Sequence, residues 1–344
     1  MRRPFVVVLA LLLAAPVSYA RRRAVAHPAS FTLPQLDAIA AGALEAGVPG
    51  LTISVSKNGS SVTRSWGNTR NDSVYQIGSV TKQFTAAAIM RLVEAGTLRV
   101  EDKARTWLPE LDARFDAITI QHLLTHRSGV ADYNSQLASA WEPKTQSQIV
   151  ALITRSGPLF TPGTRYVYSN SGYYLLGMIV ERASSKTYEQ FLRETFFEPL
   201  ALRNTSYCGT TAPSPDGYAI DIDGKVYDAP AADMSLPYAA GALCSTADDL
   251  VRWTDALHHG RVVSAQSYAR MTAPSGVAYG FALALDPLDG RRRIWHGGSI
   301  LGFETSVMYF PDEELTVVVL TNAIDLRTEH RATEIADAVA RAAK

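Results

Sequence analysis

The chain has 344 residues, of which 47% are hydrophobic and 19% are charged, and its 33 basic and 33 acidic residues give a formal net charge of zero. This composition excludes a disordered chain, and the balanced charge gives no electrostatic footprint for nucleic acid. Two cysteines exclude both a disulfide-dense scaffold and a zinc site made of four thiolates.

Residues 1–20 have the pattern of a secretory signal peptide. Arg2 and Arg3 precede the apolar run 5–15, and residues 18–20 form a small-x-small cleavage site. The apolar run is too short to span a bilayer core about 30 Å thick. We therefore expect an exported protein, periplasmic or secreted, with no stable membrane insertion once the signal is removed. An uncleaved interfacial anchor is the alternative.

Alternating apolar residues at both ends of the chain predict one antiparallel sheet. After a helix at 36–46, the strands 51–55 and 61–66 flank Asn58-Gly59, a dipeptide typical of tight hairpins. Toward the C-terminus, strands are predicted at 279–285, 292–296, 302–310 and 315–320, followed by a helix at 328–342. We expect an α/β fold of the α+β type, in which terminal helices flank this sheet.

The middle of the chain is predicted to be mainly helical. Polar loops rich in proline and glycine separate helices at 120–124, 146–154, 173–182 and 188–197. At roughly 150 residues per domain, the length allows about two domains. We therefore expect a helical domain, 101–239, inserted into a sheet domain made of 30–100 and 240–344.

Cys208 and Cys244 are the only cysteines. Export to an oxidising compartment favours a disulfide between them, and two separate buried thiols are the alternative. The bridge would close a loop of about 36 residues and contribute roughly 3 kcal/mol in the chain-entropy model.

The pattern Ser-x-x-Lys occurs twice. Ser54 and Lys57 lie on a predicted strand, where side chains three apart point to opposite faces. Ser79 and Lys82 open a strongly apolar helix, on which positions three apart are neighbours. A serine hydroxyl needs a base to become a nucleophile, and burial lowers the pKa of a lysine toward that role. The alternative is an N-capping serine beside an exposed lysine.

Tyr168 and Asn170 lie in a loop just before the predicted helix 173–182. A phenol beside a lysine can relay protons, and an asparagine amide can bind a substrate carbonyl. A packing tyrosine and a helix-capping asparagine are the alternative.

The segment His296-Gly297-Gly298-Ser299 ends a predicted strand. Glycine here lets a substrate backbone lie against the sheet edge, and the alternative is a glycine bulge after a partly buried histidine.

Taken together, these three motifs resemble those of the serine β-lactamase and penicillin-binding DD-peptidase superfamily, in the branch of class C β-lactamases, Streptomyces-type DD-carboxypeptidases and esterases. The segments 75–79, 123–129 and 241–250 look similar as well. The resemblance implies that Ser79 is acylated by an amide, peptide or ester, that Lys82 and Tyr168 transfer protons, and that substrate is bound by Asn170, His296, Gly297, Gly298 and Ser299. The backbone N–H groups of Ser79 and Ser299 would form the oxyanion hole.

Two departures from the family pattern, the loss of a lysine and the loss of a threonine whose hydroxyl often contacts the substrate, bear on the substrate. The third motif often reads Lys-Thr-Gly in β-lactamases, whereas this chain has His296-Gly297-Gly298. Loss of the lysine weakens the binding of a carboxylate, which favours a peptidase or esterase over an efficient β-lactamase. The resemblance implies a small-molecule or peptide substrate and neither a metal nor an organic cofactor, and it leaves the oligomeric state open.

Other classes fit less well. A Ser-His-Asp hydrolase would need a Gly-x-Ser-x-Gly turn, which the chain lacks. His122 and His126 have the spacing of zinc ligands, but Leu123 stands where that motif requires glutamate. A non-catalytic penicillin-binding sensor, acylated with little turnover, is the remaining alternative.

Overall fold

The computed structural model describes residues 33–209 and 215–343. The predicted signal peptide, residues 1–20, lies outside these described residues. Within them, no helix has both the length and the apolar character that crossing a bilayer requires.

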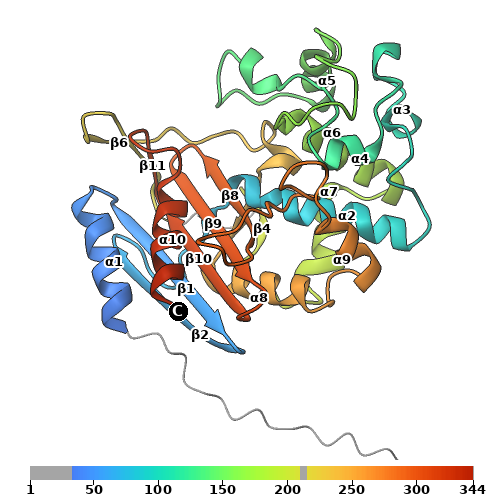
Figure 1. Ribbon diagram of the computed structural model, residues 1–344. Coiled ribbons are helices and arrows are strands. Elements are labelled where there is room, and N and C mark those ends of the chain that lie inside the picture. The colour runs from blue at the N-terminus through green and yellow to red at the C-terminus, as the bar shows by residue number, and fades with distance from the viewer. Residues whose placement is uncertain (1–32, 210–214, 344) are drawn as a thin grey trace, which may run out of the picture.

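A five-stranded antiparallel sheet forms the centre of the molecule (Figure 1). Its strands stand in the order β2 (Ser60–Gly67), β1 (Gly50–Lys57), β10 (Leu315–Thr321), β9 (Phe303–Phe310) and β8 (Ile294–Ile300). Strand β1 from the N-terminal part pairs with β10 from the C-terminal part, with Ile53 opposite Val319. The predicted fold class, a sheet built from both ends of the chain, is therefore confirmed.

The hairpin between β1 and β2 turns at the predicted dipeptide. Asn58 and Gly59 have φ angles of 52° and 79°, in the left-handed region that asparagine and glycine tolerate best. Helices α1 (Leu33–Glu45) and α10 (Arg331–Ala342) cover one face of the sheet. The opposite face packs against α8 (Ala247–His258) and the larger core cluster.

The remaining helices lie on the far side of the sheet from α1 (Figure 1). They are α2 (Thr81–Glu94), α3 (Ala104–Trp107), α4 (Ile120–Leu124), α5 (Gln146–Thr154), α6 (Asn170–Ser184), α7 (Tyr188–Leu192) and α9 (Ala265–Met271). Helix α2 packs against α6 and stacks Phe84 on Trp253 of α8, with ring centroids 3.8 Å apart. The domain boundaries at 101 and 239 remain a prediction.

Short elements complete the chain. The single-turn 3-10 segments are η1 (Gly78–Val80), η2 (Ala113–Phe115), η3 (Tyr133–Gln136) and η5 (Tyr238–Ala240), and a π-helical turn, η4 (Arg193–Phe197), follows α7. The short strands are β3 (Tyr75–Gln76), β4 (Ser206–Tyr207), β5 (Tyr218–Ile220), β6 (Val226–Asp228), β7 (Leu243–Ser245) and β11 (Ala323–Asp325).

The strand predicted at 279–285 is wrong. Only isolated bridges form there, and the backbone turns so that Gly280 N–H donates to Leu283 O at 2.8 Å. Ala282 has a φ of 56°, and a Cβ on Gly280 would lie 2.0 Å from Met271 O. The alternating pattern was misleading because packing against α9 bends this segment.

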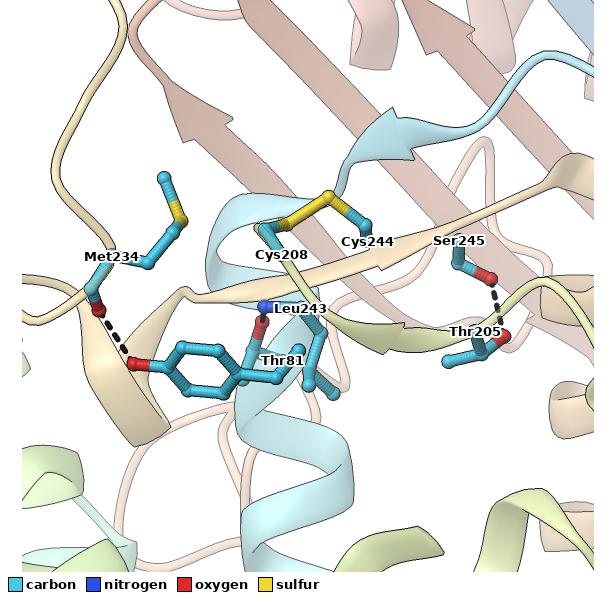
Figure 2. The surroundings of a disulfide bond; sticks show 8 residues. Thr81, Thr205, Cys208, Met234, Leu243, Cys244 and Ser245 are labelled. Carbon is cyan, nitrogen blue, oxygen red and sulfur yellow. Dashed lines mark hydrogen bonds between the residues drawn. A yellow bond between two sulfur atoms is a disulfide. The ribbon is translucent and has the colours of Figure 1, made fainter. Parts of the chain in front are cut away.

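Cys208 and Cys244 form a disulfide (Figure 2). Cys244 lies in β7, which pairs with both β3 and β4. The neighbouring residue Leu243 donates its N–H to Thr81 Oγ1, 3.1 Å away, at the first residue of α2. The covalent link therefore holds together the short sheet on which the start of α2 rests.

Candidate active site

Ser79 lies in η1, which leads directly into α2. The predicted helix therefore begins with a single 3-10 turn, and Gly78 enters it with a φ of 49°. Ser79 is half-buried, whereas Lys82, one turn further along, is fully buried. The Oγ of Ser79 and the Nζ of Lys82 are 2.9 Å apart.

Lys82 Nζ lies against two further oxygens. It donates to Asn170 Oδ1 at 2.8 Å and to the carbonyl oxygen of Ala240 at 2.7 Å. Burial lowers the pKa of Lys82 to about 7, although the nearby charge of Asp132 acts to raise it. Near neutral pH a large fraction of this amine is therefore uncharged.

The three neighbours of Lys82 suit an uncharged amine. The amide oxygen of Asn170 and the carbonyl of Ala240 can only accept hydrogen bonds, so they take the two N–H groups of a neutral amine. The remaining lone pair then faces the hydroxyl of Ser79. The geometry gives the serine proton an acceptor within hydrogen-bond distance.

Asp132 fixes the orientation of Asn170. Its Oδ2 accepts hydrogen bonds from the backbone N and from the Nδ2 of Asn170, at 2.9 and 3.0 Å. Because the amide nitrogen faces Asp132, the amide oxygen must face Lys82. Sequence reasoning missed Asp132, since no motif includes it and its only local signal is the N-cap of η3, where it accepts from Asn134 N.

Tyr168 lies over the same amine. Lys82 Nζ is 4.9 Å from the centre of its ring, and the phenol is hydrogen-bonded to Ser79. Desolvation by the surrounding protein raises the pKa of Tyr168, and the bond to Ser79 opposes that change only in part. The side chain still exposes 36% of its surface. At neutral pH Tyr168 is thus an accessible, protonated phenol that can donate a proton.

Strand β8 approaches η1 very closely. A Cβ on Gly298 would lie 2.0 Å from Ile77 O and 3.0 Å from Ser79 N, and one on Gly78 would lie 2.8 Å from Ser299 N. Only glycine at both positions lets the two backbone segments meet at this distance. The backbone nitrogens of Ser79 and Ser299 consequently lie in the two segments that meet beside the Ser79 hydroxyl.

His296 is buried, and the protein engages both of its ring nitrogens. Nδ1 lies 2.6 Å from Gly297 O and Nε2 lies 2.9 Å from the hydroxyl of Tyr279. A carbonyl can only accept, so Nδ1 carries the proton and Nε2 accepts from Tyr279. Burial lowers the pKa of His296 to about 3, and the charge of Lys82 acts in the same direction. His296 is therefore uncharged at neutral pH.

Tyr279 joins His296 to His126. Ser169 donates its N–H to His126 Nδ1 at 3.2 Å, so the proton of that ring is on Nε2, which lies 3.3 Å from Tyr279 Oη. The hydrogen bonds therefore run in one direction, from Ser169 through His126 and Tyr279 to His296. The His126 ring also packs on Tyr168, with centroids 4.2 Å apart. Sequence reasoning missed Tyr279, which it placed in a strand.

His122 of α4 and His126, two residues past the end of that helix, have separate structural contacts. His122 Nδ1 accepts from Thr119 N in a capping box, and His126 belongs to the chain just described. In the described part of the protein, no group of three or more His, Cys, Asp or Glu side chains could hold a metal ion.

A family model described as Beta-lactamase matches residues 36–341, almost the whole described chain. The chain belongs to this family. The predicted superfamily, which includes β-lactamases and penicillin-binding proteins, is thereby confirmed.

Individual relatives of this family member are distant. A penicillin-binding protein of Bacillus subtilis is 29% identical over 280 residues, covering 74% of this chain and 61% of the relative. A D-aminopeptidase of Gluconobacter oxydans is 26% identical over 298 residues, covering 80% and 56%. The structure of a D-stereospecific amidohydrolase from Streptomyces sp. has a TM-score of 0.77 at 27% identity, covering 85% of this chain and 95% of that one. The chain spans about three fifths of the length of the curated relatives that it matches.

Two hollows open from Ser79 in this β-lactamase family member. One, of about 420 Å³, extends past Asn170 toward Tyr133, Trp141 and Leu236. The other, of about 610 Å³, extends past Tyr168 and His296 to the start of α10. Ser79 therefore lines both hollows, so a group bound at this residue could extend into one hollow on the Asn170 side and into the other on the Tyr168 side.

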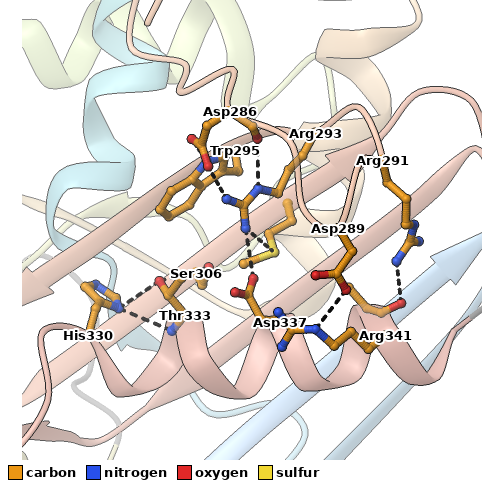
Figure 3. A network of polar contacts seen from close by, with 12 residues as sticks. Asp286, Asp289, Arg291, Arg293, Trp295, Ser306, His330, Thr333, Asp337 and Arg341 are labelled. Carbon is orange, nitrogen blue, oxygen red and sulfur yellow. Dashed lines mark hydrogen bonds and ion pairs between the residues drawn. The ribbon is translucent and has the colours of Figure 1, made fainter. Parts of the chain in front are cut away.

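Ion pairs of Arg293, the residue just before β8, fix the position of this strand (Figure 3). Its buried guanidinium is bound to Asp286 and, at 2.8 Å, to Asp337 of α10. Asp286 also accepts from the indole nitrogen of Trp295 at 2.6 Å. These contacts tie the strand that ends in the glycine motif to α10.

Proposed function

We propose that the protein hydrolyses amide or ester bonds through an acyl-enzyme on Ser79. The observation that carries the proposal is the buried Lys82 amine, 2.9 Å from the Ser79 oxygen and with a pKa lowered to about 7. The similarity to a D-aminopeptidase and a D-stereospecific amidohydrolase supports amide hydrolysis.

In the first step Ser79 Oγ attacks the substrate carbonyl carbon and its proton passes to Lys82 Nζ. The negative charge that develops on the carbonyl oxygen is stabilised by the N–H groups of Ser79 and Ser299. The bond to the leaving nitrogen or oxygen then breaks, and that atom receives a proton from Tyr168. Lys82 then gives the proton that it took from Ser79 to the phenolate of Tyr168, over whose ring its Nζ lies, 4.9 Å from the centre.

In the second step water attacks the acyl carbon and the same groups act in reverse. The water proton passes to the Lys82–Tyr168 pair, the bond between the acyl carbon and Ser79 Oγ breaks, and Oγ regains its proton. Asn170 serves this cycle by accepting from Lys82, while Asp132 holds it in that orientation.

The hollow beyond Asn170 suits an apolar acyl group. Tyr133, Leu137, Trp141 and Leu236 line it, and among the described residues its lining contains no charged side chain. An uncharged acyl group would bury apolar surface there without leaving an unpaired charge.

The test combines a covalent label with a turnover assay. We expect the wild-type protein to react with a fluorescent penicillin and to turn over a short-chain ester, and Ser79→Ala to lose both while remaining folded. Lys82→Ala should slow acylation by about a hundredfold or more. Stable labelling without turnover of any ester or amide would support the alternative of a non-catalytic penicillin-binding sensor. Unchanged activity in Ser79→Ala would disprove the assignment of Ser79 as the nucleophile.

A further inference from the structure

The hollow on the Tyr168 side is the place for the leaving group. Tyr168 is the accessible phenol next to Ser79, and the leaving atom must receive its proton from that side. This hollow ends at Glu329, His330 and Glu334, at the start of α10. The charges of these three side chains, together with His296, decide which leaving groups fit.

Neither histidine of this hollow supplies a positive charge. His296 donates from Nδ1 to Gly297 O and accepts at Nε2 from Tyr279. His330 accepts from Thr333 N at Nδ1, 3.3 Å away, as the cap of α10 (Figure 3). Its Nε2 lies 3.1 Å from Gly298 O. Each ring thus has one nitrogen that donates and one that accepts, as in a neutral imidazole. Burial lowers the pKa of both histidines.

The other charged groups are acidic. Glu329 is exposed and makes no hydrogen bond or ion pair with the described residues. Arg331 lies beside Glu334, but its guanidinium is bound to Asp325 and Glu334, both at 2.8 Å. Glu329 and Glu334 thus form a negative wall of the leaving-group hollow, in which Glu334 is paired with Arg331 and Glu329 is unpaired, and among the described residues that line the hollow there is no arginine or lysine.

A carboxylate on the leaving group would meet this wall. In a D-alanyl-D-alanine peptide the leaving amine is attached to a carbon that bears a carboxylate, and in a penicillin the lactam nitrogen is attached to such a carbon. A primary amide, an amino-acid amide, an alkylamine or an alcohol carries none. Like charges placed side by side in a cleft reduce binding; Arg331 offsets the charge of Glu334, and among the described residues no cation offsets that of Glu329.

We propose that the enzyme selects substrates with an uncharged or cationic leaving group and discriminates against leaving groups that carry a carboxylate. This inference rests on the proposed function, because it assumes that Ser79 is acylated. The inference predicts that the substrates are simple amides or esters, in preference to a D-alanyl-D-alanine terminus or a β-lactam.

Two pairs of substrates isolate the charge. N-acetyl-D-alanyl-D-alanine and its C-terminal amide share the acyl group and differ by one carboxylate. The acetate esters of 3-hydroxybenzoate and 3-hydroxybenzamide likewise share the acyl group and differ by one carboxylate, here on an aryl leaving group. The enzymatic rate for each ester is divided by its rate of hydrolysis by hydroxide without enzyme. We expect kcat/KM to favour the uncharged member of each cleaved pair by on the order of tenfold to a hundredfold.

Variants of Glu329 test whether the negative wall causes the preference for an uncharged leaving group. Glu329→Lys should reduce this preference about tenfold or more, and Glu329→Gln should reduce it less. Glu198→Gln, an exposed change of the same charge that lines neither hollow, should leave the preference unchanged. Thermal melting checks that each variant is folded.

The outcomes separate the two proposals. Equal rates, or a preference for the carboxylate, overturn the inference while the proposed function stands, provided that Ser79→Ala abolishes both reactions. A preference that Glu329→Lys does not change also overturns it, because the negative wall is then not the cause. If no member of either pair is cleaved, the proposed function fails, and the inference fails with it.

Discussion

Gly298→Ala tests whether the close approach of β8 to η1 creates the oxyanion hole. The new Cβ would lie 2.0 Å from Ile77 O, and the three atoms nearest to it are all backbone. A real Cβ requires at least about 3.0 Å, so the strand must move by about 1 Å. A shift of that size takes the Ser299 N–H out of hydrogen-bond range of an oxyanion near Ser79. Loss of one such donor costs about a hundredfold to a thousandfold in kcat.

The assay is steady-state ester hydrolysis together with thermal melting. Gly42→Ala is the matched control, since Gly42 is exposed in α1 with nothing within 4 Å of its Cβ position. That change should leave kcat unaltered and stabilise the helix by up to about 1 kcal/mol. If Gly298→Ala keeps wild-type kcat in a folded protein, the argument that this approach builds the oxyanion hole is refuted.

Three further predictions follow from the same contacts. Lys82 must be neutral to accept a proton, and its pKa is lowered to about 7. We therefore expect kcat/KM to rise with pH up to about 7 and then to level off. A flat profile between about pH 5 and 8 would contradict this expectation. Tyr279→Phe leaves ring nitrogens of His126 and His296 unpaired, so urea unfolding should show a loss of about 1–3 kcal/mol, and an unchanged midpoint would argue against the hydrogen-bonded chain. Replacing Cys208 and Cys244 by serine should cost roughly 3 kcal/mol, and a reductant should shift the wild-type midpoint equally; no shift would argue against the disulfide.

The sheet could be predicted from the sequence because its strands alternate in a regular way. Asn58-Gly59 marked one hairpin, and β9 and β10 were predicted to within a residue or so of their ends. The segment 279–285 shows the limit of this approach. Its alternation reflects packing on both sides of a turn, and the turn itself is set by the contact of Gly280 with Met271 O in α9, which no local pattern reports.

The structure brings together residues that the motifs singled out, and sequence reasoning missed contacts that no motif marks. Ser79 and Lys82 are three positions apart on a helix, so their contact follows from helical geometry. Asp132 meets Asn170 across 38 residues, and Tyr279 meets His126 across 153 residues. The first contact depends on how η3 packs against α6, and the second on how the segment 279–285 packs against the residues after α4. Such packing is a property of the fold and not of any short stretch of sequence.

The position of Asp132 explains why Lys82 can act as a base. A carboxylate in direct contact with an amine usually favours its charged form, by one to three pKa units. Here Asp132 binds the two N–H groups of Asn170, and the neutral oxygen of Asn170 faces the amine. The negative charge is thereby kept one residue away, so burial outweighs it and the pKa of Lys82 falls to about 7. The same carboxylate that orients the asparagine thus leaves the lysine able to accept the Ser79 proton.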